Sequence, residues 1–311
     1  MSERTQTPLR VGTRGSALAR SQTALVTGAI VELGRKVETV EIVTHGDRST
    51  AALTQIGGTG VFVSALRDAL VAGGIDVAVH SYKDLPTAPA DGLVVAAVPA
   101  REDPRDVLVA RDGLTLGELP PGARIGTGSP RRAAQVRALG LGVELVPIRG
   151  NVDTRLGKVT AGELDAVILA RAGLARLDRL DAVTETLDPL QVLPAPAQGA
   201  LAVECRAADT DTVGLLAALD HADTRAAVDA ERALLIALEA GCTAPIGGLA
   251  EVVDDDDGTV IFLRGSVTAA DGSDAVRLSA TGPMTEAAAV GRRLAAELID
   301  AGAHSLMGSG P

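Results

Sequence analysis

Residues 124–130 read RIGTGSP, and they repeat the order of residues 10–16, RVGTRGS. Both stretches run from arginine through a β-branched residue, glycine and threonine to a serine, and a helical pattern follows each of them. Serine is a good N-cap, and a proline such as Pro130 suits the first position of a helix. We therefore expect two copies of a strand, a tight turn and a helix.

The segments that close these units also resemble each other, since residues 73–81 read GGIDVAVHS and residues 161–170 read AGELDAVILA. In the first copy we expect strands at 9–13, 37–43 and 75–79, with helices at 17–33 and 61–71 between them. Strands that alternate with helices predict a parallel sheet. The fold class is thus α/β, with two similar lobes and a ligand cleft beyond the carboxyl ends of their strands.

The pattern changes after the two lobes. A long Ala- and Leu-rich helix is expected at 223–240, followed by β segments at 248–253, 260–268 and 275–281 and a helix at 284–301. This predicts a third, α+β domain. We divide the chain into a first lobe (1–99 with 198–219), a second lobe (100–197) and a C-terminal domain (220–311). The glycine-rich segment 45–60 has few core-forming residues and is interpreted as a lid.

Charge and composition exclude several classes of function. Forty acidic residues against 29 basic ones give a net charge of −11, which disfavours nucleic acid and anionic membranes as partners. The first eight residues lack an apolar signal region and no run of eighteen apolar residues occurs, so we expect a cytoplasmic protein. The four histidines lack metal-ligand spacing and the two cysteines form no CxxC motif, so no metal is expected.

Arginines gather where the predicted turns and element ends lie. A turn that leads into a helix offers backbone N–H groups to an anion, and a guanidinium group binds a carboxylate through two parallel hydrogen bonds. Since no nucleotide-binding motif is present, a ligand with several carboxylates fits better than a nucleotide. Solvated helix faces are the competing interpretation. The arginines are Arg14, Arg131, Arg132, Arg149, Arg155 and Arg176.

Three further side chains are candidates for chemistry. Asp84 follows an apolar strand and Lys83, so it faces the predicted cleft, although it could also be a surface residue that begins a turn before Pro86. Cys242 follows Gly241 in a loop after a helix, where a ligand can reach it, and local sequence alone leaves an idle thiol possible as the alternative. Cys205 lies in the apolar stretch ALAVEC and is interpreted as a buried core residue.

Several motifs together resemble the porphobilinogen deaminase family, also called hydroxymethylbilane synthases. They are LRVGTRGSALA (9–19), HSYKDLP (80–86), GTGSPRR (126–132), IRGNVDTR (148–155), PAQGALAVECR (196–206), EAGC (239–242) and CTAPIG (242–247). The resemblance spans nearly the whole chain. It implies two lobes like those of type II periplasmic binding proteins, a third domain, and a monomer. The implied activity joins four porphobilinogen molecules head to tail, with loss of ammonia, and hydrolyses the product to hydroxymethylbilane.

The resemblance also implies roles for individual residues. Asp84 matches the catalytic aspartate, which would stabilise the cationic methylene-pyrrole left when the amine departs and accept a pyrrole proton. Cys242 matches the cysteine that carries a covalent dipyrromethane cofactor through a thioether. The implied cofactor-binding residues are Lys83, Ser129, Arg131 and Arg132. The implied substrate-binding residues are Arg14, Ser16, Arg149, Arg155 and Arg176.

Three positions differ from the family pattern. Thr59 stands where many members have lysine, and Gly128 and Pro130 replace serine and leucine. The loss of a charge at residue 59 puts a carboxylate contact of the predicted lid in question. Two other classes share the two-lobe architecture: a passive solute-binding protein and the effector-binding domain of a transcription regulator. The third domain and Cys242 speak against the first, and the absence of an evident helix-turn-helix motif speaks against the second.

Overall fold

A computed structural model describes residues 7–42, 60–238, 245–255 and 258–307. The chain forms two compact units, of which the first comprises Met1–Arg101 and Ala200–Arg225 and the second comprises Glu102–Gly199 and Ala226–Pro311. The second unit contains two separate sheets, so the segment predicted as a third domain shares a unit with the second lobe. Among the described helices, none is long and apolar enough to cross a membrane.

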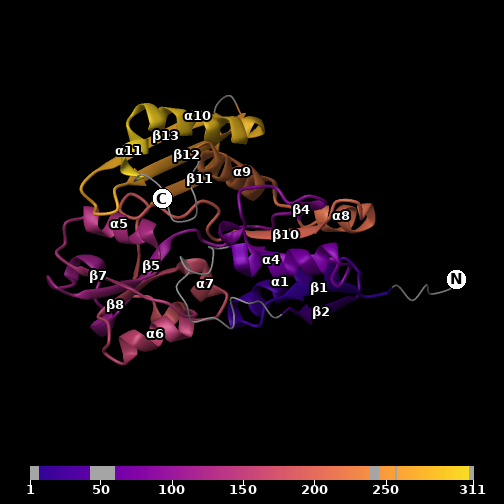
Figure 1. The fold of residues 1–311 in the computed structure, drawn as a ribbon, viewed down its shortest axis with the longest axis horizontal. Coiled ribbons are helices and arrows are strands. Elements are labelled where there is room, and N and C mark those ends of the chain that lie inside the picture. Colours follow the sequence, from indigo (N-terminus) through magenta and orange to yellow (C-terminus); the bar gives the residue numbers. More distant parts are fainter. Residues whose placement is uncertain (1–6, 43–59, 239–244, 256–257, 308–311) are drawn as a thin grey trace. The chain divides into compact units, whose positions relative to one another are not determined.

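The first unit is built on a five-stranded sheet (Figure 1). In sheet order its strands are β2 (Val37–Glu41), β1 (Leu9–Thr13), β3 (Val77–Ser81), β10 (Leu201–Arg206) and β4 (Leu93–Ala97). Its helices are α1 (Ala17–Glu32), α4 (Gly60–Val71) and α8 (Thr210–Ala217). Val11, Val77 and Val203 are fully buried in its core.

The second unit repeats this arrangement. In sheet order its strands are β7 (Glu144–Pro147), β6 (Arg124–Thr127), β8 (Ala166–Ala170), β5 (Asp106–Ala110) and β9 (Glu185–Thr186). Its helices are α5 (Pro130–Ala138), α6 (Val152–Thr160) and α7 (Arg171–Ala175). Each position of the first sheet has a counterpart of the same direction in the second, so the predicted pair of similar α/β lobes is confirmed.

The prediction of parallel sheets is wrong for part of each lobe. Strand β10 runs antiparallel to β3 and β4, and β5 runs antiparallel to β8 and β9. Both strands begin soon after the chain has crossed from one unit to the other, at Ala200 and at Glu102. They are therefore entered without the crossover helix that a parallel neighbour needs. The sheets are mixed.

The pairing of β1 with β3 and of β6 with β8 shows which residues of the two lobes correspond. Val11 of β1 pairs with Val77 of β3, and Ile125 of β6 pairs with Ala166 of β8. A Cβ atom on Gly12 would lie 2.4 Å from Cδ1 of Ile75, and one on Gly126 would lie 2.6 Å from Cδ1 of Leu164. The repeated glycine therefore leaves room for the apolar residue that precedes the neighbouring strand.

An aspartate next to that apolar residue is repeated as well. The backbone N–H of Arg10 donates to Oδ2 of Asp76 at 3.0 Å, and the N–H of Arg124 donates to Oδ2 of Asp165 at 2.7 Å. Each aspartate thus fixes the start of the strand that leads into the Gly/Ser turn. The shared arginine of the two motifs serves as a donor at the strand start, remote from the turn itself.

The remaining sheet is antiparallel. Its strands are β11 (Ile246–Asp255), β12 (Gly258–Thr268) and β13 (Ala275–Pro283), and its helices are α9 (Ala222–Ala237), α10 (Ala287–Asp300) and α11 (Ala303–Leu306). Figure 1 shows α10 lying along this sheet, and Leu234, Leu263 and Leu294 are fully buried between the layers. This confirms the predicted α+β segment. Short 3-10 turns are η1 (Tyr82–Asp84), η2 (Arg111–Gly113), η3 (Leu116–Glu118), η4 (Leu180–Ala182) and η5 (Met284–Glu286).

Candidate functional site

Asp84 lies on a short turn that is pinned at both ends. Strand β3 extends to Ser81, two residues further than predicted, and η1 follows it directly. Tyr82 and Leu85 on either side are buried, and the N–H of Tyr82 donates to the carbonyl of Ala200 at 3.0 Å. Asp84 itself is exposed, and its carboxylate makes no ion pair with any residue that the structure describes. The fold therefore presents an acid on a rigid support.

The first Gly/Ser turn lies in the same unit as Asp84. Ser16 caps α1, since its Oγ accepts the N–H of Ala19 at 3.2 Å, as predicted. Arg14 in this turn and Lys83 beside Asp84 are both half-buried. The predicted residues Arg14, Ser16, Lys83 and Asp84 therefore all belong to the first unit.

The second turn explains two departures from the family pattern. Pro130 is the first residue of α5, where its missing N–H costs nothing, and Oγ of Ser129 accepts the N–H of Arg132 at 3.5 Å. A Cβ atom on Gly128 would lie 2.7 Å from the carbonyl oxygen of Ile148. Glycine therefore allows the turn to approach the segment that carries Arg149.

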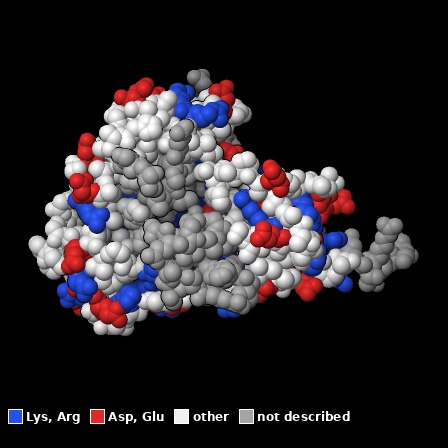
Figure 2. Space-filling model, in the orientation of Figure 1, with Lys and Arg blue, Asp and Glu red and all other residues white. Residues whose placement is uncertain are grey.

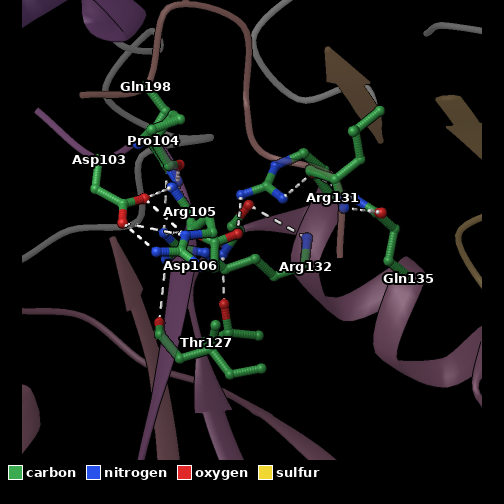
Figure 3. Close-up of polar contacts among 12 residues, drawn as sticks. Asp103, Pro104, Arg105, Asp106, Thr127, Arg131, Arg132, Gln135 and Gln198 are labelled. Atoms are coloured by element: carbon green, nitrogen blue, oxygen red, sulfur yellow. Dashed lines mark hydrogen bonds and ion pairs between the residues drawn. The ribbon is translucent and has the colours of Figure 1, made fainter. Parts of the chain in front are cut away.

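Arg131 and Arg132 are buried, with exposed fractions of 4% and 6%. Figure 3 shows both guanidinium groups directed at Asp106, which each of them reaches at 2.7 Å. Their remaining Nη donors bind the carbonyls of Leu193 and Ile168. Burial acts to raise the pKa of Asp106, but the two guanidinium groups outweigh it and hold that pKa well below its usual range. The two arginines are thus part of an ordered interior network.

The other predicted arginines of the second unit gather near this network. Burial lowers the pKa of Arg155, and the positive charges of Arg132 and Arg149 lower it further. Arg155 donates from Nε to the carbonyl of Gly150 at 2.9 Å, while Arg149 is exposed. The structure therefore brings Arg132, Arg149 and Arg155 close enough to interact electrostatically, as an anion site requires.

Arg176 follows α7 and is turned inward. Its Nη2 donates to the carbonyl of Gly199 at 2.6 Å, and burial lowers its pKa while Glu102 opposes that effect. A hollow of about 440 Å³ lies beside Arg149 and is also lined by Arg124 and Lys158. Three cationic side chains therefore line one hollow of a chain that is acidic as a whole.

The predicted cofactor cysteine, Cys242, and residues 45–59 of the predicted lid, Thr59 included, lie outside the described residues, whereas Gly60 begins α4. The elements that flank Cys242 in sequence, α9 and β11, are described, and a hydrogen bond of Glu231 connects them. This fully buried carboxylate of α9 accepts the N–H of Ala250 in β11 at 2.8 Å and also the N–H of Ala197. Ala197 has a φ of 61°, a left-handed conformation that alanine seldom adopts, so the hydrogen bond helps to hold it.

The second cysteine is confirmed as a core residue. Cys205 is fully buried in β10, and burial raises the pKa of its thiol to about 11. Among the described residues, no group of three or more metal-binding side chains occurs. On the described part of the face drawn in Figure 2, acidic and basic side chains are interspersed.

Comparisons with known proteins agree with these features. Residues 9–214 match the family model described as porphobilinogen deaminase, dipyromethane cofactor binding domain. Residues 225–300 match the model described as porphobilinogen deaminase, C-terminal domain. The two models together span β1 to α10, apart from the end of α8 and the start of α9.

Named relatives extend over almost the full chain. Porphobilinogen deaminase of Nocardia farcinica is 60% identical over 97% of this chain and 89% of its own. That of Mycobacterium tuberculosis is 61% identical over 96% of this chain and 98% of its own, and that of Mycobacteroides abscessus is 60% identical over 96% and 99%. Among solved structures, the methionine-binding protein MetQ is 10% identical, with a TM-score of 0.44 over 68% of this chain and 89% of its own.

Proposed function

Because the chain belongs to the porphobilinogen deaminase family, we propose that it makes hydroxymethylbilane for tetrapyrrole biosynthesis from four porphobilinogen molecules. Each addition breaks the bond between the aminomethyl carbon and nitrogen and releases ammonia. The freed methylene carbon then bonds to the α-carbon of the preceding ring, which gives up its proton. Water finally cleaves the finished product from the enzyme.

This proposal rests on a difference between Asp84 and the buried acids: arginines bind the buried acids, whereas Asp84 has no ion pair among the described residues. The buried carboxylates of Asp106 and Glu204 are held by arginine side chains at 2.7 Å and 2.8 Å. Asp84 is exposed and makes no ion pair among the described residues, so its negative charge is available to a ligand. A fixed carboxylate stabilises a positive charge that develops next to it, and it can take up a proton afterwards. We assign both tasks to Asp84.

The residues present fit a dipyrromethane cofactor with several carboxylates. Within the described residues, the buried Nε–H groups of Arg131 and Arg132 have no hydrogen-bond acceptor, which suits an anion that the chain itself does not supply. Lys83, Ser129, Arg131 and Arg132 would hold the group, and Cys242 would attach it through a thioether. When bound, it supplies the ring carbon to which the first substrate is joined.

Arginines of both lobes serve the substrate. Every pyrrole ring carries an acetate and a propionate, so negative charge accumulates as the product grows. The exposed Arg149 and the partly buried Arg155 offer charge-assisted hydrogen bonds that are worth about 1.5–3 kcal/mol each. Arg14, Ser16 and Arg176 complete the substrate-binding set.

The enzyme acts as a cytoplasmic monomer without nucleic acid or membrane partners. The net charge of −11 supports the exclusion of anionic partners. Light scattering coupled to gel filtration measures the oligomeric state, and a mass near 31.4 kDa is expected.

A colour reaction tests the proposed function directly. Purified protein treated with acidified dimethylaminobenzaldehyde should develop colour, because a covalently bound pyrrole reacts with this reagent. The same preparation should consume porphobilinogen and release hydroxymethylbilane. A colourless protein that leaves porphobilinogen unchanged would instead support a passive binding protein or an effector-binding domain.

Replacing Arg149 or Arg155, which lie near Arg132, should slow the enzyme more than replacing an arginine on α10. We expect Arg149→Ala and Arg155→Ala each to lower the rate of porphobilinogen consumption by about tenfold or more, since each loses a charge-assisted bond. Arg293→Ala is the control: its guanidinium lies on α10 and donates to the carbonyl of Thr281 at 2.7 Å. The control should stay within about twofold of wild type. Equal, small losses in all three variants would contradict the assignment.

A further inference from the structure

A single buried carboxylate organises the cation cluster of the second unit. Asp106 begins β5 and is fully buried. Its Oδ2 accepts from Nη2 of Arg131 at 2.7 Å, and its Oδ1 accepts from Nη2 of Arg132 and from Nε2 of Gln198, each at 2.7 Å (Figure 3). Every one of these side chains is at least nine-tenths buried. The acid is therefore the common partner of both arginines.

The charges in this cluster do not balance. Two guanidinium groups share one carboxylate, so the cluster keeps one net positive charge in the interior. An uncompensated interior charge is costly, and purely structural ion pairs avoid it by matching their charges. The carbonyls of Leu193 and Ile168 accept two of the remaining donors, while both Nε–H groups find no acceptor among the described residues. The excess charge and spare donors indicate a place prepared for an anion.

The first lobe offers a contrasting cluster. Glu204 is buried in β10, and Arg67 binds it through two nitrogens at 2.8 Å and 3.0 Å. Here one acid meets one arginine, and the buried His80 lies 3.2 Å from the same carboxylate. In an ion pair of this kind, the charge of the arginine balances the charge of the acid. The cluster around Asp106 differs by one additional arginine.

We propose that Asp106 is a positioning residue, which holds Arg131 and Arg132 in place for a carboxylate of the pyrrole chain and limits the cluster to one net positive charge. This inference rests on the proposed function and deepens it. Asp106 does not touch the ligand in this assignment. It acts through the two arginines, because a carboxylate that binds both Nη2 groups fixes their orientation while leaving both Nε–H groups to donate.

Gln198 ties this acid to the chain segment before β10. Its Nε2 donates to the carbonyl of Pro104 at 2.7 Å as well as to Asp106, and Nη2 of Arg132 lies 3.4 Å from its Oε1. Replacing Gln198 by methionine keeps the size of the side chain but removes one donor to the acid. This milder change should loosen the arginines without leaving a buried charge unpaired.

The first measurement is anion binding in a cofactor-free background. In full-length Cys242→Ser protein, which cannot form the thioether, we compare the rise in melting temperature with inorganic phosphate for Asp106→Asn and for Glu204→Gln. Asp106→Asn raises the cluster charge from one to two, so phosphate should bind about tenfold more tightly than to the parent. Glu204→Gln also loses a buried acid, and should lower stability without a change in the phosphate response.

The second measurement uses the cofactor-loaded enzyme. Asp106→Asn should consume porphobilinogen about tenfold more slowly or worse, because its amide cannot accept from both guanidinium groups, and Gln198→Met should show a smaller loss of the same kind. Glu204→Gln, compared at equal folded fraction, should stay within about twofold of wild type. Unchanged phosphate binding in Asp106→Asn, or turnover losses that match those of Glu204→Gln, would overturn the inference.

Failure of this inference can be told apart from failure of the proposed function. If wild-type protein neither reacts with the pyrrole reagent nor consumes porphobilinogen, the function itself is wrong. If wild type does both and Asp106→Asn behaves like Glu204→Gln, only the role of Asp106 is wrong. Should Asp106→Asn fail to fold, Gln198→Met decides: turnover equal to wild type would contradict the positioning role.

Discussion

Asp84→Asn should lower the turnover of porphobilinogen by about two to three orders of magnitude. Asparagine keeps the shape of the side chain but removes the charge that meets the cation and the base that takes the proton. Asp84 is exposed and makes no ion pair among the described residues, so the free energy of unfolding should change by less than about 0.5 kcal/mol. Steady-state kinetics and thermal melting measure the two effects separately.

A second acid in the same unit serves as the control for Asp84. Asp91 is exposed on the loop that precedes β4, and Asp91→Asn removes the same charge from the same unit. We expect its turnover to stay within about twofold of wild type. If Asp84→Asn were equally active, or if its loss followed a fall in melting temperature, the catalytic assignment would be wrong.

Cys242→Ser should abolish the covalent cofactor. If the thiol of Cys242 holds a dipyrromethane through a thioether, denatured wild-type protein should exceed the mass of its sequence by two pyrrole units. Brief exposure to porphobilinogen should then add further pyrrole masses. A serine cannot form the thioether, so both increments should disappear, and intact-protein mass spectrometry detects them.

Cys205 is the matched control for this experiment. It is buried in β10 and its thiol pKa is raised to about 11 by burial, so it remains protonated and unreactive near neutral pH. Cys205→Ser should keep both mass increments in its folded fraction. An adduct that maps to Cys205, or a wild-type mass equal to the bare chain after expression in cells that make porphobilinogen, would overturn the assignment.

Much of the architecture could be predicted from local pattern. Local sequence predicts the repeated Gly/Ser turns, the N-caps Ser16 and Ser129 and the closing α+β segment, because each of them depends on residues that are near in sequence. The direction of β5 and β10 could not be predicted in this way, because it depends on where the chain crosses between units. The burial of Arg131 and Arg132 was not foreseen, because their common partner Asp106 lies 25 and 26 residues earlier in the chain.

The residues that sequence reasoning missed are buried acids. Asp106, Glu231 and Glu204 are each at most 2% exposed. Their partners lie between 19 and 137 residues away in the chain, so no local window contains both members of a pair. A signal did exist for Asp106 and Glu204, since each interrupts or heads an otherwise apolar strand: DVLVA and LAVECR. An acid in such a strand requires a partner and predicts an arginine nearby.

The repeated topology allows the two lobes to be compared residue by residue. Counting from the paired residues Val77 and Ala166, the counterpart of Asp84 is Gly173, and the strand register makes Leu201 the counterpart of Asp106. Neither acid is present at the corresponding position of the other lobe. The two similar lobes thus differ in charge. The first lobe exposes the carboxylate of Asp84, and the second lobe buries two arginines around the single carboxylate of Asp106. Two lobes with the same topology therefore carry opposite charges at their candidate sites, which suits a reaction that joins a cation to a growing anion.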